Sequence, residues 1–157
     1  MTVTTLCTLF FFLSCADGEI IDRVVASVND TAITLSELRE KHAAMRKSIP
    51  ALTENEALQS MIHAQLLLEK ARHMRIEGDT PDELIATYID LKIRTSVVVQ
   101  EDAILSYYRE NREKLGGVEF RLVREEIEKY LTEQETTQLL KEHIQRLREV
   151  ADIAVLF

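Results

Sequence analysis

The sequence has no tryptophan and is poor in cysteine, glycine and proline. Two cysteines, four glycines and two prolines occur in 157 residues, and aromatic residues make up only 6%. The core must therefore be packed from aliphatic side chains, and the scarcity of glycine and proline favours long helices over many tight turns. Both cysteines, Cys7 and Cys15, lie in the first fifteen residues. The rest of the chain can form no disulfide, no thiolate metal site and no thiol nucleophile.

Motifs of catalytic chemistry are also missing. The sequence contains no Gly-x-Ser-x-Gly elbow, phosphate-binding loop or dinucleotide fingerprint. Its four histidines are His42, His63, His73 and His143. No two of them are three or four residues apart, the spacing that brings two metal ligands to one face of a helix. We therefore predict a protein that is not an enzyme and that holds no metal or cofactor.

An excess of basic charge is absent as well. Acidic residues outnumber basic ones by 27 to 19, which gives a formal net charge of -8. Phosphate backbones would be repelled by this surface, so nucleic acid is disfavoured as a partner. Hydrophobic residues make up 46% of the chain, enough for the core of one globular domain of this length.

Residues 1–16 differ in composition from everything that follows. They carry no charge, and the apolar run 6–13 is shorter than the roughly 20 residues that span a bilayer. Small residues at Ser14 and Ala16 predict a signal peptide cleaved after Ala16, although no Lys or Arg precedes the run. The alternative is a lipoprotein acylated at Cys15, with Phe12 where that motif usually has leucine. The protein is thus expected to be periplasmic or secreted, or anchored to a membrane by lipid.

A β-hairpin that leads directly into a helix is predicted over 20–48. The apolar residues of its first strand recur at period two, and they are Ile20, Val24, Ala26 and Val28. Asn29-Asp30 supplies the turn, and residues 32–34 return as a second strand. Ser36 is the predicted N-cap of the helix. Because an isolated hairpin is marginally stable in water, it needs a further strand or helix.

Capping signals place the central helices. Thr53 and Glu56 form a capping box that opens a helix to about residue 75, ended by Gly78. Its apolar residues cover most of its girth, which predicts a central position in the fold. Thr80-Pro81 opens the next helix, and the β-branched residues 97–99 predict an extended connector before a helix over 101–115.

The last part of the chain is predicted as one long helix to about residue 150 and a strand over 153–157. Two polar residues, Gln134 and Thr137, interrupt the apolar stripe of the helix, so its middle is expected to pack less well. Gly116-Gly117 forms a flexible joint before this helix.

Two segments resemble SurA-type periplasmic chaperones. The first runs from Asp22 to Leu38, and the second, over 99–111, includes the Tyr107-Tyr108 pair. The resemblance implies a mainly α fold with a small β-sheet, in which the C-terminal strand pairs with the N-terminal hairpin. In the family, prolyl isomerase domains are inserted where Gly116-Gly117 stands. Nothing is inserted here, so that activity is not transferred.

The resemblance also implies a function for residues 17–157, with a hairpin and helices over 17–115 and a helix and strand over 118–157. It implies an ATP-independent holdase that binds unfolded envelope or outer-membrane polypeptides in an apolar groove. The candidate groove residues are Met45, Ile49, Leu52, Met61 and Met74. Met61 and Met74 lie in apolar helical surroundings that also suit the core, whereas Met45 and Leu52 flank the break at Pro50. The alternative function is a non-catalytic helical adaptor that docks a folded partner, or a dimer formed by exchange of the C-terminal segment.

Overall fold

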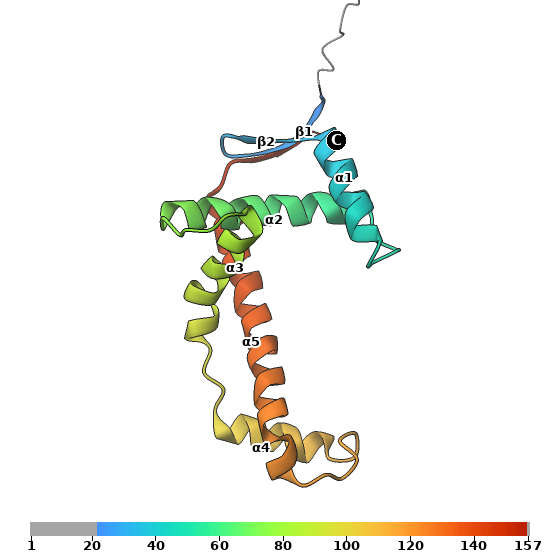
Figure 1. Ribbon diagram of the computed structural model, residues 1–157, viewed down its shortest axis with the longest axis vertical. Coiled ribbons are helices and arrows are strands. Elements are labelled where there is room, and N and C mark those ends of the chain that lie inside the picture. Colours follow the sequence, from blue (N-terminus) through green and yellow to red (C-terminus); the bar gives the residue numbers. More distant parts are fainter. Residues whose placement is uncertain (1–21, 157) are drawn as a thin grey trace, which may run out of the picture.

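The structure, a computed structural model, describes residues 22–156 and is mainly helical with one small sheet (Figure 1). The elements in chain order are β1 (Val24–Val28), β2 (Thr31–Thr34), α1 (Leu35–Arg46), α2 (Glu54–His73), α3 (Pro81–Lys92), the short 3-10 helix η1 (Arg94–Ser96), α4 (Glu101–Asn111), α5 (Phe120–Val150) and β3 (Ile153–Val155). The predicted fold class is confirmed. The predicted signal peptide and Cys15 lie outside the described residues.

The two ends of the described chain meet in a three-stranded antiparallel sheet of order β2-β1-β3. β1 is the central strand, and Val28 lies opposite Thr31 on one side and Ile153 on the other. Asn29 turns the hairpin with a φ of 50° and exchanges hydrogen bonds with Asp152, just before β3. The implied pairing of the C-terminal strand with the hairpin is therefore confirmed, and it supplies the third strand that the hairpin needs.

Two details of the hairpin prediction are wrong. A β-bulge between Val24 and Ala26 shifts the alternation, so Val25 is buried and Val24 is 37% exposed. The helix α1 is capped by Thr34 instead of Ser36, because Glu37 stands three residues after Thr34 and completes a capping box. Three residues after Ser36 stands Arg39, which cannot accept a hydrogen bond in return.

The core lies between the sheet, α1, α2 and the C-terminal end of α5. α2 is its centre, as predicted: three consecutive side chains, Leu66, Leu67 and Leu68, are buried. The capping boxes at Thr53 and Thr80 are both present, so these helices begin where the sequence places them. The stop after α2 differs from the prediction. Arg75 takes a left-handed φ of 55° ahead of Gly78, whose φ is not positive.

Figure 1 shows that the molecule has the shape of a hook. The head is formed by the sheet, α1 and α2, and the arm by α3, α4 and most of α5, which runs from the tip of the arm back to the head. In this view α1 and the loop after α4 lie on the same side of α5. The arm has only a small buried cluster of its own, with Ile93, Ile104 and Ile127 enclosed between α3, α4 and α5.

Candidate functional site

Three of the five candidate groove residues lie at the turn from α1 into α2, and a fourth, Met61, lies in the first half of α2. Met45, Leu52 and Met61 are half-buried and pack against the core, and Ile49 is 52% exposed. We call these four residues the corner cluster. They combine two flexible thioethers with two branched aliphatic side chains, a surface that can adapt to apolar groups of different shape.

The turn that presents the corner cluster is held by hydrogen bonds. The amide of Ile49 donates to the carbonyl of Met45 at 3.0 Å, and Arg46 Nε donates to the carbonyl of Pro50 at 3.1 Å. His42 donates from Nε2 to the carbonyl of Leu52 at 2.8 Å. The exposure of Ile49 is thus a property of a well-bonded turn, which ends α1 before Pro50 as the sequence predicts.

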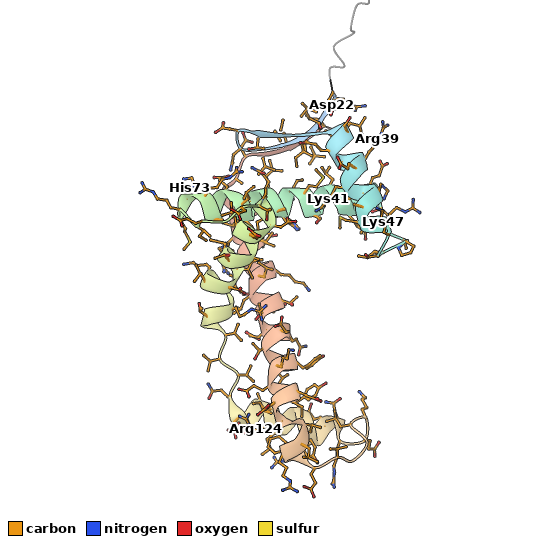
Figure 2. The ribbon with its side chains drawn as sticks, in the orientation of Figure 1. Asp22, Arg39, Lys41, Lys47, His73 and Arg124 are labelled. Atoms are coloured by element: carbon orange, nitrogen blue, oxygen red, sulfur yellow. The ribbon has the colours of Figure 1, made fainter. Side chains whose placement is uncertain are left out.

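Met74 lies far from the corner cluster. It follows the last residue of α2, about 20 Å along the helix from Met61, the member of the cluster that stands nearest to it in the chain. In Figure 2, His73 lies at the end of α2, and Lys47, at the end of α1, lies on the opposite side of the head. Met74 is 51% exposed, although its apolar surroundings in the sequence suited the core. The predicted helix from Thr53 to about residue 75 already implies this separation, because Met74 stands at the opposite end of that helix from the turn at Pro50.

Further exposed apolar side chains lie on the arm, where the sequence prediction placed no site. The large ones are Leu91, Val98, Val118, Leu122 and Tyr130. Val98 and Tyr130 line an open hollow of about 1060 Å³ between residues 96–100 and the middle of α5, whereas the other three do not line it. Gln134 and Thr137, the polar residues predicted to loosen the packing in the middle of the long helix, also line this hollow, whereas Thr136 between them is buried.

A smaller hollow of about 460 Å³ lies at the head, beside the hydrogen bonds that join the hairpin turn to the start of β3. Asn29, Glu69 and Asp152 line it, and these residues are already engaged with one another. Within residues 22–156, no group of three His, Cys, Asp or Glu side chains could hold a metal ion. The helices over the same range are each too short or too polar to span a bilayer.

Ion pairs tie the arm together. Arg94, between α3 and the connector, pairs with Asp90 and with Glu133 of α5. Arg124 of α5 pairs with Glu101 at the start of α4 and with Glu128, and it marks the lower end of the arm in Figure 2. Its hydrogen bonds lower the pKa of Glu101 below the ordinary value. These exposed pairs fix geometry more than they add stability.

Two half-buried histidines lie where α5 packs against the other helices. Burial lowers the pKa of His63 on α2, and nearby Arg148 on α5 lowers it further. His143 on α5 shares a hydrogen bond of 2.8 Å with the hydroxyl of Tyr88 on α3. Burial lowers its pKa too, and nearby cations including Arg146 add to this effect. Both histidines are therefore neutral packing residues at neutral pH.

No family model matches the sequence. The chain is similar to the protein named Chaperone SurA from Legionella pneumophila (strain Paris) and from Legionella pneumophila subsp. pneumophila (strain Philadelphia 1). Each is 26% identical to this chain over an alignment that covers 82% of it and 36% of the relative. The chain thus spans about a third of the length of the curated relatives it matches. The similarity supports a distant SurA-like relationship.

Proposed function

We propose that this chain is an ATP-independent chaperone that holds unfolded polypeptides on apolar surface at the turn between α1 and α2. The observation that carries the proposal is the corner cluster, in which Ile49 stands exposed on a hydrogen-bonded turn among half-buried thioether and aliphatic side chains. The distant similarity to Chaperone SurA supports the same conclusion. The clients are unfolded envelope or outer-membrane proteins.

The chemistry of the cluster suits a client that has no fixed structure. An unfolded chain offers apolar side chains in varying order, and methionine repacks around them at little cost in free energy. Each contact is weak, so a client is held through several contacts and released without nucleotide hydrolysis. The net negative charge of the chain keeps such an apolar surface soluble by repulsion between copies.

The proposal assigns different roles to the five candidate residues. Ile49 makes first contact because it is the most exposed of the four in the corner cluster. Met45, Leu52 and Met61 form the adaptable floor. Met74, at the other end of α2, is a separate contact for a longer client segment.

The test is suppression of aggregation. A urea-unfolded outer-membrane protein is diluted into buffer with the purified chain, and light scattering is followed over time. We expect the unmodified chain to suppress scattering at several-fold excess, and Ile49→Ser to suppress it less without a change in thermal stability. Leu91→Ser removes an equally exposed leucine on α3 and serves as the control. No suppression by the unmodified chain would contradict the proposal.

Export is part of the proposal. Cleavage after Ala16 would leave residues 17–157 as the working chaperone core in the periplasm, and acylation at Cys15 would instead anchor it to a membrane. Mass spectrometry of the N-terminus of the protein recovered from cells distinguishes the two outcomes.

An adaptor or exchanged dimer is the second candidate. It is favoured by the C-terminal segment, in which α5 is followed by a three-residue edge strand, β3, and by the exposed Leu156. Such a terminal segment can pair with a second copy in the same way. Light scattering after size-exclusion chromatography would show a stable dimer if this candidate is right.

A further inference from the structure

The connector between η1 and α4 has an extended backbone with unpaired hydrogen-bonding groups. Val97 has φ -78° and ψ 123°, and Gln100 has φ -75° and ψ 145°, both in the extended region. Within residues 22–156, the amides and carbonyls of Val98 and Val99 make no hydrogen bond to the protein. Val97 uses only its amide, which donates to Arg94, and Gln100 uses only its carbonyl, which accepts from the first turn of α4. The connector therefore resembles a free sheet edge.

Free edges of this kind are normally protected. Proteins place lysine, proline or a bulge on them, because an exposed extended segment invites pairing with another chain. The connector has three consecutive valines and none of these protections, and Val98 is 73% exposed. The nearest cation in sequence, Arg94, is occupied by Asp90 and Glu133. An unprotected edge of high β-propensity promotes aggregation unless a partner strand covers it.

The hollow beside the connector offers room for such a partner. Its far wall is the stretch of α5 where Gln134 and Thr137 replace apolar residues, so the connector and the helix do not close on each other. Figure 1 shows the connector running alongside α5 without helical or sheet structure. Tyr130 stands in the wall and packs at a tilt against Tyr107 of α4, with ring centroids 5.2 Å apart. The wall thus combines an aromatic face with amide and hydroxyl groups.

The charge of the arm selects the partner. Residues 101–142 contain seven basic and eleven acidic side chains, a net charge of -4. The charged side chains that line the hollow are Glu133, Glu135 and Lys141, and Glu133 is paired with Arg94. An acidic segment would be repelled, whereas a neutral or basic segment would be attracted.

We propose that the connector, residues 97–100, binds an extended, apolar, neutral or basic segment of an unfolded polypeptide by adding it as a β-strand along its free backbone, with the client side chains in the hollow against α5. The inference rests on the proposed chaperone function and adds a second, backbone-directed site to the corner cluster. Backbone pairing gives affinity without reading the sequence, which suits a binder of many clients.

The first test uses two synthetic peptides and the full chain. One is a fluorescein-labelled ten-residue peptide of alternating valine and threonine with a lysine at each end. The other has the same side chains but a methyl group on every second backbone nitrogen, which removes those hydrogen-bond donors. We expect fluorescence anisotropy to show binding of the first peptide and at least about tenfold weaker binding of the second, about 1.4 kcal/mol. Equal affinity for the two peptides would overturn the inference.

The second test changes the protein. Val98→Pro and Val99→Pro remove amides on opposite edges of the connector, and neither amide makes a hydrogen bond within the described residues. We expect at least one of them to weaken binding about tenfold, because a client strand pairs with one edge. Val98→Lys keeps the backbone and adds a protecting charge, and it is expected to weaken binding as well. Leu122→Ser, an exposed leucine of α5 outside the hollow, is the matched control and is expected to bind normally.

Failure of the inference and failure of the proposed function have different signatures. If the unmodified chain suppresses aggregation and all three connector variants match it in peptide binding, the connector site is wrong and the chaperone proposal stands. If the unmodified chain neither binds the peptide nor suppresses aggregation, both are wrong. If light scattering shows a dimer that Val98→Lys dissolves, the connector pairs with a second copy and the inference is overturned. The N-methylated peptide gives its answer on the unmodified chain, so it does not depend on the folding of any variant.

Discussion

Asn29 joins the hairpin to the C-terminal strand. It occupies the hairpin turn with a left-handed φ of 50°, and its backbone amide donates to the carbonyl of Asp152 at 2.7 Å. Its side-chain oxygen accepts from the amide of Asp152 at 2.9 Å, and its side-chain nitrogen donates to Glu69 at 2.6 Å. One side chain therefore ties the hairpin both to β3 and to α2.

Replacing Asn29 by alanine should remove both side-chain bonds and leave a residue poorly suited to the turn. A neutral hydrogen bond contributes about 1 kcal/mol, and one to a charged group about 1.5 kcal/mol or more. Alanine in the left-handed region adds about 1 kcal/mol. Because the site is exposed, we expect a total loss of about 2–3 kcal/mol. Asn29→Gly loses the same bonds without the backbone cost, so it should lose about 1–2 kcal/mol.

The assay is urea unfolding followed by circular dichroism. With a denaturant slope of about 2 kcal/mol per molar urea, Asn29→Ala should lower the midpoint by about 1–1.5 M with an unchanged slope. Hydrogen exchange of the Leu156 amide, which donates to the carbonyl of Val25, should also accelerate because β3 detaches first. Asp30→Ala changes the other turn residue and is the control, expected within about 0.5 kcal/mol of the unmodified chain. If Asn29→Ala matched that control, the hydrogen bonds of Asn29 to Asp152 and Glu69 would not hold the two ends of the chain together.

Three further outcomes follow from the described residues. Arg75→Gly should raise the free energy of unfolding by about 0.5–1 kcal/mol, because glycine adopts the left-handed φ without a steric cost; a lower urea midpoint would contradict this. Stability should be complete above about pH 6.5 and fall as the pH drops below it, because the lowered pKa values of His63 and His143 let the unfolded chain take up protons first. Urea midpoints at several pH values test this, and the double variant His63→Gln/His143→Gln should fall less; an equal fall would refute the assignment. Leu58→Ala should cost about 2–5 kcal/mol and lower the melting temperature by several degrees, because the side chain is completely buried at the start of α2; a change below 1 kcal/mol would show that the core is not centred there.

The sequence by itself determined the positions of the helices and of the N-terminal hairpin. Capping boxes at Thr53 and Thr80 act over three residues, so they can be recognised without knowing what lies elsewhere in the fold. The polar interruption at Gln134 and Thr137 is also a local signal, and both residues line the hollow beside α5. The C-terminal strand was also predicted from its residues, but its pairing with the hairpin was expected only through the family resemblance, since nothing nearby in sequence selects its partner.

Only the tertiary structure decided the rest. The bulge that buries Val25 is set by the pairing of β1 with β2. The hollow exists because two elements about 35 residues apart in the chain run side by side without closing. Such relations join residues that are distant in sequence, and hydrophobic periodicity carries no information about which faces meet.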